Sequence, residues 1–175
     1  MKKPLVNRYV FVCLFMFLFA CDNDDGDVQP NLDTVGFDID VSGSTSRNMQ
    51  GSNATYRFLD MPSSFVTSHQ LAMYLTDGDG YTVIATILLN GTTLPGTGTY
   101  EVNDIFNSNG LELFDAGLSF GQNGGISHNT IGGSGTITIT ETGSGFIKGT
   151  LDGSLRATSN GGGEVSLKGS FYAEE

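Results

Sequence analysis

Gly135-Thr136-Ile137-Thr138-Ile139-Thr140 decides the fold, together with two later stretches of the same kind at residues 147–156 and 165–171. In each stretch, apolar residues or glycine alternate with threonine, serine or charged residues. Successive side chains of a β-strand point to opposite faces of the sheet, so this alternation predicts three strands with one buried face. Glycine interrupts the apolar row of the last two stretches, which predicts a strongly coiled C-terminal sheet.

Upstream segments show the same alternation and are separated by turn residues. They predict strands at residues 35–41, 54–58, 71–75, 81–89, 99–102 and 111–120. The segment 81–89 carries apolar residues on both faces, so we expect it to be the central strand. Asp77-Gly78-Asp79-Gly80 predicts a tight hairpin turn, because Asp-Gly steps accept positive φ angles. Loops are predicted at residues 107–110 and, rich in glycine, at residues 121–135.

No stretch of the mature chain shows a sustained helical period, and only residues 61–68 or 104–106 could form a short helical turn. The short polar connections favour antiparallel pairing, because parallel pairing needs long crossovers. The sequence therefore predicts an all-β domain, an antiparallel meander of about eight or nine strands. It forms either a β-sandwich or a flattened, partly closed barrel, and the sequence does not separate the two.

The N-terminus has the layout of a secretory signal: Lys2, Lys3 and Arg8, an apolar run from Tyr9 to Ala20, and then Cys21. A dozen helical residues reach only about 18 Å, which is short of the roughly 30 Å hydrocarbon core of a bilayer. Leu18-Phe19-Ala20-Cys21 resembles the lipobox that is cleaved before a lipidated cysteine. We therefore expect residues 1–20 to be a lipoprotein signal peptide and Cys21 to be acylated. The alternative is an ordinary signal peptide with an incidental cysteine.

Cysteine usage favours the acylated alternative. The sequence has two cysteines, and Cys13 lies within the predicted signal, so the mature chain keeps a single thiol and forms no internal disulfide. Diacylglycerol on the sulfur of Cys21 and a further acyl chain on its nitrogen would hold the protein stably to a lipid bilayer.

Acidic and small residues follow Cys21, beginning with Asp22-Asn23-Asp24-Asp25-Gly26-Asp27. Residues 21–33 are therefore expected to be an acidic, flexible tether, and residues 34–175 a single β-domain. The acidic cluster is similar to the surface-export signal of Bacteroidetes lipoproteins, which implies an outer-membrane location facing the cell exterior. A periplasmic-facing location is the alternative. Asp33-Thr34-Val35 resembles an O-glycosylation acceptor of exported Bacteroidetes proteins, which makes Thr34 a candidate modification site.

The charge balance is strongly acidic. The chain has 8 basic and 19 acidic residues, a net charge of −11. Removal of the signal takes three basic residues and no acidic one, which leaves the mature chain at −14. A surface of this charge repels phosphate backbones, so nucleic acid is excluded as a partner.

The C-terminal strands also resemble a known group of proteins. The cadence of residues 135–140, 147–151 and 165–171, with Leu94-Pro95-Gly96-Thr97-Gly98-Thr99-Tyr100, is similar to an uncharacterised family of small Bacteroidetes surface lipoproteins. The likeness covers roughly the last eighty residues, and these motifs are strand-and-turn patterns of modest specificity. The sequence departs from the family at Leu151, Leu167 and Lys168. The resemblance implies an all-β fold and a surface location, and it supplies no site.

Motifs for chemistry are incomplete. Gly132-Gly133-Ser134-Gly135-Thr136 lacks the last glycine of a nucleophile elbow. His69 and His128 have no nearby partner at the spacing of a zinc site. Asp77 and Asp79 lack the further oxygen ligands of a calcium loop, and the hairpin turn explains them. We therefore expect no catalytic residue, no metal site and no cofactor, and no enzymatic activity.

Three hypotheses for function remain. The first is a non-catalytic binding or accessory module, in which loops 90–95, 103–110 and 121–135 are presented to a glycan or a surface protein. The second is a lipocalin-like carrier that encloses a small apolar ligand, with the inward glycines of the last two strands making room for it. The third is a hydrolase that uses carboxylates among Glu101, Asp104, Glu112 and Asp115. A packed core with exposed aromatic loop residues favours the module, a continuous interior cavity favours the carrier, and two carboxylates that face each other across a cleft favour the hydrolase.

Overall fold

The computed structural model describes residues 32–61, 68–103, 112–123, 125, 127–159 and 162–175. In these residues the chain is all-β, as predicted, with no helix. The ten strands are β1 (Gly36–Gly43), β2 (Arg47–Gly51), β3 (Asn53–Met61), β4 (Ser68–Thr76), β5 (Tyr81–Leu89), β6 (Gly98–Val102), β7 (Ala116–Gln122), β8 (His128–Gly143), β9 (Phe146–Ala157) and β10 (Glu164–Glu174). The predicted signal, Cys21 and most of the tether lie outside the described residues, as do Asp104 and the predicted loop at 107–110.

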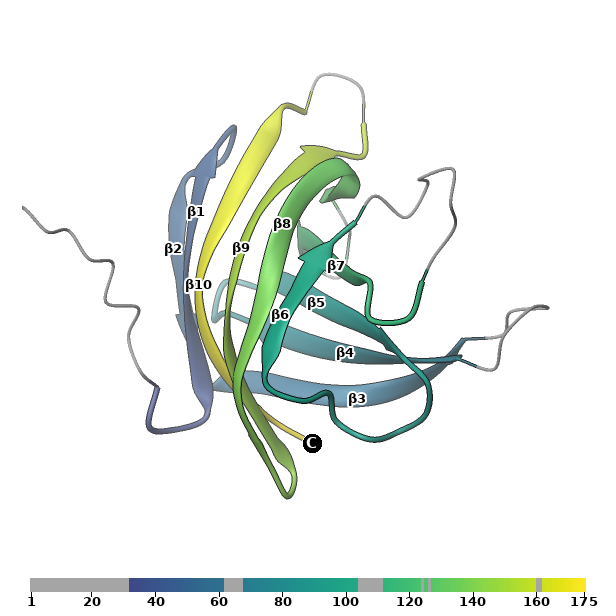
Figure 1. Cartoon of the computed structure of the whole chain (residues 1–175). Coiled ribbons are helices and arrows are strands. Elements are labelled where there is room, and N and C mark those ends of the chain that lie inside the picture. Colours follow the sequence, from purple (N-terminus) through teal and green to yellow (C-terminus); the bar gives the residue numbers. More distant parts are fainter. Residues whose placement is uncertain (1–31, 62–67, 104–111, 124, 126, 160–161) are drawn as a thin grey trace, which may run out of the picture.

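All ten strands belong to one sheet of order β2-β1-β10-β3-β4-β5-β7-β6-β8-β9, and additional pairings of β9 with β10 and of β7 with β8 close it partly into a ring. Figure 1 shows β8, β9, β10, β1 and β2 crossing steeply over β3, β4 and β5. Most pairings are antiparallel, but Glu174 of β10 pairs with Thr55 of β3 in parallel, and Val102 of β6 pairs with Ala116 of β7 in parallel. The sheet is therefore mixed, and the arrangement is that of a partly closed barrel.

Three local predictions are corrected. The sequence analysis missed β2, since Met49 is the only buried residue in Arg47–Gly51. Residues 112–115 form a turn, so the strand predicted from residue 111 begins at Ala116. Part of the predicted loop at 121–135 is strand, because β8 begins at His128 with a register shift between Asn129 and Ser134. Glycines permit this bulged pairing: a Cβ on Gly133 or Gly135 would overlap backbone oxygens of β9.

The core fills the inside of the barrel. Alternate residues of each strand face inward and form one cluster of buried apolar side chains. The bulkiest fully buried members are Phe120, Phe171, Ile39, Met49, Leu71, Met73, Leu75, Ile87, Ile137, Ile139, Ile147 and Leu151. The predicted central strand, β5, is paired on both sides, with β4 and β7. Leu88 points outward from β5 but is also buried, beside the turn at residues 112–115. The Leu88 N–H donates to the Asp115 carbonyl, and the Phe114 N–H donates to the Leu88 carbonyl.

The inward glycines of β9 and β10 leave room for neighbouring core groups. A Cβ on Gly149 would lie 2.9 Å from Cζ of Phe171, one on Gly153 would lie 2.7 Å from Cδ1 of Leu118, and one on Gly169 would lie 2.6 Å from Cα of Ile39. β8, β9 and β10 curve strongly, as the glycine pattern predicts (Figure 1). The space above these glycines is thus occupied by the protein's own atoms.

Candidate functional site

A seam of the barrel lies where β2 meets the turn between β4 and β5. In the described part of the chain, β2 pairs with β1 on one edge, and the Asp77–Gly80 turn approaches its other side. The turn is the predicted Asp-Gly hairpin: Asp77 Oδ1 accepts the backbone N–H groups of Asp79 at 3.0 Å and Tyr81 at 2.8 Å, and Gly80 has a φ of 81°. Asp77 therefore holds the turn, which agrees with the sequence interpretation.

Arg47 closes the seam. Its Nη2 donates to Asp77 Oδ2 at 2.9 Å and to Asp79 Oδ2 at 2.8 Å, and its Cζ lies 3.6 Å from the centre of the Tyr81 ring. The side chain of Asp77 is 5% exposed and that of Arg47 is 19% exposed, whereas Asp79 is 76% exposed. The pair with Asp77 is therefore largely shielded from water, and the pair with Asp79 is open to it.

A chain of polar side chains continues along the outer face of β1 and β2. Gln50 Nε2 donates to Asn48 Oδ1 at 2.5 Å, and Asn48 Nδ2 donates to both Asp38 Oδ1 and Asp40 Oδ1 at 2.9 Å. Each of these side chains has a further donor or acceptor that these bonds do not use. The face can therefore offer hydrogen bonds to a ligand without breaking its own.

These groups surround an open hollow of about 390 Å³, which we call the β2 hollow. It is lined by Arg47, Asn48, Gln50, Asp77, Gly78 and Asp79. Planar amide, carboxylate and guanidinium groups present pairs of donors and acceptors at fixed spacing, which suits the hydroxyl groups of a polar ligand. No group of three or more histidine, cysteine or acidic side chains arranged to hold a metal ion occurs in the described ranges.

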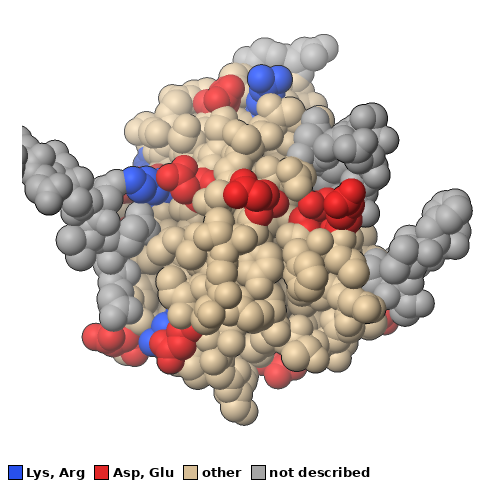
Figure 2. All heavy atoms as spheres, viewed as in Figure 1, with Lys and Arg blue, Asp and Glu red and all other residues tan. Residues whose placement is uncertain are grey.

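The electrostatic surroundings of the hollow are acidic. The strand registers align Glu101, Thr136, Asp152, Lys168 and Asp40 in one row across β6, β8, β9, β10 and β1, and Asn48 continues the row into the hollow. Figure 2 shows a band of mainly acidic side chains across the middle of one face, with a basic side chain at its left end and a broad uncharged area below it. An approaching anion meets like charge here, so the hollow suits neutral or cationic groups.

A second, more apolar hollow of about 250 Å³ lies on the outer face of β4, β5 and β7. It is lined by Tyr74, Thr76, Thr82, Ile84, Ser119, Phe120, Gly121 and Gly125. Its side-chain polar groups are the hydroxyls of Tyr74, Thr76, Thr82 and Ser119, and those of Thr76 and Thr82 bond each other. The β2 hollow presents charged and amide groups instead, so we place the candidate site there.

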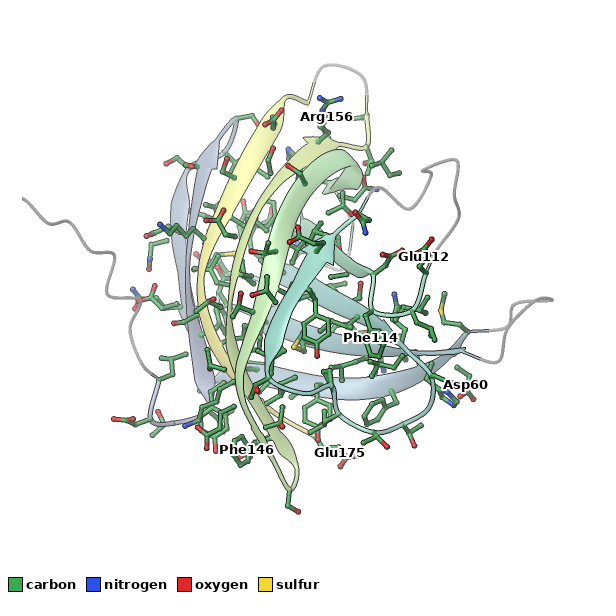
Figure 3. All side chains as sticks on the ribbon, viewed as in Figure 1. Asp60, Glu112, Phe114, Phe146, Arg156 and Glu175 are labelled. Atoms are coloured by element: carbon green, nitrogen blue, oxygen red, sulfur yellow. The ribbon has the colours of Figure 1, made fainter. Side chains whose placement is uncertain are left out.

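Of the carboxylates named in the hydrolase hypothesis, Glu101, Glu112 and Asp115 are described, and Asp104 lies outside the described residues. Asp115 accepts from Asn103 Nδ2 and from the Glu112 backbone N–H, both at 2.7 Å, and so holds its own turn. Glu101 and Glu112 are exposed, and Figure 3 shows Glu112 at the edge of the molecule. Asp115 is therefore a turn-forming residue.

The other candidate residues are placed as follows. Thr34 is exposed just before β1 and is thus accessible for modification. Ser134 lies within β8 opposite Ser154. His69 lies 3.3 Å from Asp60 at the open end of β4. The sequence analysis missed Arg47, Asn48 and Gln50 because they lie in the unpredicted β2.

Two tyrosines that point into the barrel have perturbed acidity. Burial raises the pKa of the Tyr100 phenol, whose hydroxyl donates to the Gly96 carbonyl at 2.7 Å. Burial, followed by the negative charge of Glu175, raises the pKa of Tyr56. Both phenols therefore stay protonated to higher pH than a free tyrosine, which suits a structural role inside the barrel.

No protein-family model matches the chain, and no curated protein or solved structure is significantly similar to it. The molecule is an all-β, partly closed barrel with a filled interior and a polar hollow on its outside. In the described residues there is no helix of a length and apolarity that could cross a bilayer.

Proposed function

We propose that this protein is a lipoprotein anchored in the outer membrane through acylated Cys21 and displayed at the cell surface, where its β-domain binds a glycan in the β2 hollow. Binding at this hollow is non-catalytic. The observation that carries the proposal is the pairing of a filled barrel interior with a polar hollow outside it. A glycan offers many neutral hydroxyl groups, which match the planar polar side chains and the acidic surroundings.

A carrier function is the alternative, and it needs interior space. Phe171, Leu118 and Ile39 occupy the space above the inward glycines that a carrier would leave to its ligand. This packing supports binding at the outer surface in preference to enclosure.

The anchor is tested by Cys21→Ala in the full-length chain. We expect the wild-type protein in the membrane fraction and the variant largely in the soluble fraction, because the acyl chains supply the membrane affinity. Mass spectrometry of the wild-type N-terminal peptide should show cleavage before Cys21 and an acylated thiol. An unmodified Cys21, or a variant that stays equally with membranes, would refute this half of the proposal.

The hollow is tested with acyl-free mature protein on a panel of neutral glycans and heparin fragments. We expect micromolar retention of a neutral glycan, little retention of heparin, and about tenfold weaker binding after Gln50→Ala, the size of one well-formed hydrogen bond. Gln70→Ala is the matched control, since Gln70 lies on β4, outside the residues that line the hollow. If Gln50→Ala retains the glycan as well as wild type does, or if no glycan is retained at all, glycan binding at this site is contradicted.

A further inference from the structure

Three connections between strands meet at the C-terminal end of β1, the end away from the tether. The turn after β1 carries Ser44, the connection into β8 carries Ser127, and the segment before β10 carries Gly163. β1 has eight residues, so this end lies about 26 Å from the point where the tether joins the barrel, at about 3.3 Å per residue. At this end His128, 6% exposed, lies between two serines. Its Nε2 is 3.4 Å from Ser44 Oγ, and its Nδ1 is 3.1 Å from Ser127 Oγ.

Ser127 is placed to orient the imidazole of His128. Ser127 Oγ donates its single proton to the Phe120 carbonyl oxygen at 3.1 Å. In the tautomer with the proton on Nδ1, His128 donates to Ser127 Oγ, and Ser127 keeps its own proton for the Phe120 carbonyl. Nε2 is left with a lone pair directed at the Ser44 hydroxyl, which donates to it. This is the arrangement of a serine and its general base, with a hydroxyl in the orienting position that a carboxylate occupies in a Ser-His-Asp triad.

The surrounding residues hold His128 in place and leave Ser44 exposed. The imidazole packs against the Phe120 ring at 5.9 Å between centroids, while Ser44 is exposed and its backbone N–H donates to the Glu164 carbonyl at 2.9 Å. Gly163 has a φ of 75°, and a Cβ there would lie 2.7 Å from Ser44 Cβ and 3.2 Å from Ser44 Oγ. Only glycine fits beside Ser44, and it leaves that side of the hydroxyl clear of a side chain.

We infer that Ser44 is a nucleophile activated by His128, and that this end of the barrel accepts acyl groups from small, soluble esters. This activity is separate from glycan binding. Ser44 Oγ forms a bond to the acyl carbon while its proton moves to His128 Nε2, the bond to the alkoxide leaving group breaks, and the leaving group takes the proton. Water then attacks the acyl-serine, gives its proton to Nε2, and releases the acid as Ser44 recovers the proton. A distance of 3.4 Å between serine and base is typical of an empty site, in which such bonds are long until substrate binds.

The test uses acyl-free mature protein with a fluorophosphonate probe, which forms a bond to an activated serine oxygen with loss of fluoride. We expect one adduct, mapped to Ser44 by peptide mass spectrometry, together with slow hydrolysis of p-nitrophenyl acetate. Ser44→Ala should abolish the adduct, and His128→Gln, which keeps a similar volume, should slow labelling about a hundredfold or more. Ser127 is a positioning residue, so Ser127→Ala should slow labelling by about tenfold and Ser127→Thr should restore it.

Ser46→Ala and His69→Ala are matched controls, because Ser46 is exposed in the same turn and His69 is the second histidine. Both should label at the wild-type rate. Thermal unfolding of each variant separates loss of chemistry from loss of fold. If the folded wild-type protein gives no Ser44 adduct, or if folded His128→Gln labels as fast as wild type, His128 and Ser44 form a structural hydrogen bond only and the inference is wrong. Neither result bears on glycan retention.

Discussion

Phe171→Ala is expected to lower the free energy of unfolding by about 3 to 5 kcal/mol, the cost of removing a fully buried aromatic ring. Phe171 is 1% exposed and lies in β10 between Phe37 of β1 and Gly149 of β9. Its ring covers Gly149, the position where a carrier would leave space for a ligand. Truncation leaves a cavity lined by apolar atoms, and the sheet on both sides is held by its ladder and cannot collapse to fill it.

Urea denaturation followed by circular dichroism measures this change, and an unchanged slope of the transition shows that the shift in midpoint reports stability. Phe114→Ala is the matched control, since Phe114 is 54% exposed and its loss should cost well under half as much. If Phe171→Ala costs no more than Phe114→Ala, the interior is loose and the carrier hypothesis regains support.

Sequence reasoning succeeded where one local pattern determines the result. The alternation in β9 and β10 places Leu151, Leu155 and Leu167 in the core, and the Asp-Gly steps form the hairpin before Tyr81. In each case the information lies within a few residues, because strand faces alternate with period two and Asp-Gly favours a tight turn.

The same reasoning failed where partners are distant in the chain. β2 contains a single inward apolar residue, Met49, so no alternation marks it, and its pairing with β1 stabilises it instead. β8 begins within a run of glycine and polar residues that resembles a loop. Strand propensity is context-dependent, and here the edge of β9 supplies the context.

The candidate sites also depend on contacts between residues that are distant in the chain. Arg47 and Asp77 are 30 residues apart, and Ser44 and His128 are 84 apart. Each contact depends on how the sheet closes on itself, through the pairings of β9 with β10 and of β7 with β8. No spacing rule within the sequence contains this information, so Asp77 and His128 were each considered alone, and Arg47 and Ser44 were not singled out.

Arg47→Met is expected to lower the free energy of unfolding by about 2 to 4 kcal/mol, because it leaves the carboxylate of Asp77 shielded from water without its cation. Methionine keeps the length of the side chain and its packing on Tyr81, so the loss reports mainly on charge. Two backbone N–H groups still reach Asp77, which keeps the cost below that of a fully isolated buried charge. Arg57→Met is the matched control: Arg57 also lies over a tyrosine ring, that of Tyr74, but is exposed and should lose about 1 kcal/mol or less.

A double-mutant cycle decides whether Arg47 acts as the closure of the seam. Asp77→Asn removes the charge but keeps an oxygen that can accept the N–H groups of the turn. The double variant Arg47→Met, Asp77→Asn should therefore lose less free energy of unfolding than the sum of the two single-variant losses. We expect a coupling of about 1 to 3 kcal/mol, measured by urea denaturation. Hydrogen exchange should show faster exchange in β2 and in the 77–81 turn of Arg47→Met, since these are the two sides that the guanidinium joins. If the two losses of unfolding free energy simply add, or if hydrogen exchange rises equally in β9 and β10, Arg47 does not stabilise the contact between β2 and the turn. It then only lines the hollow.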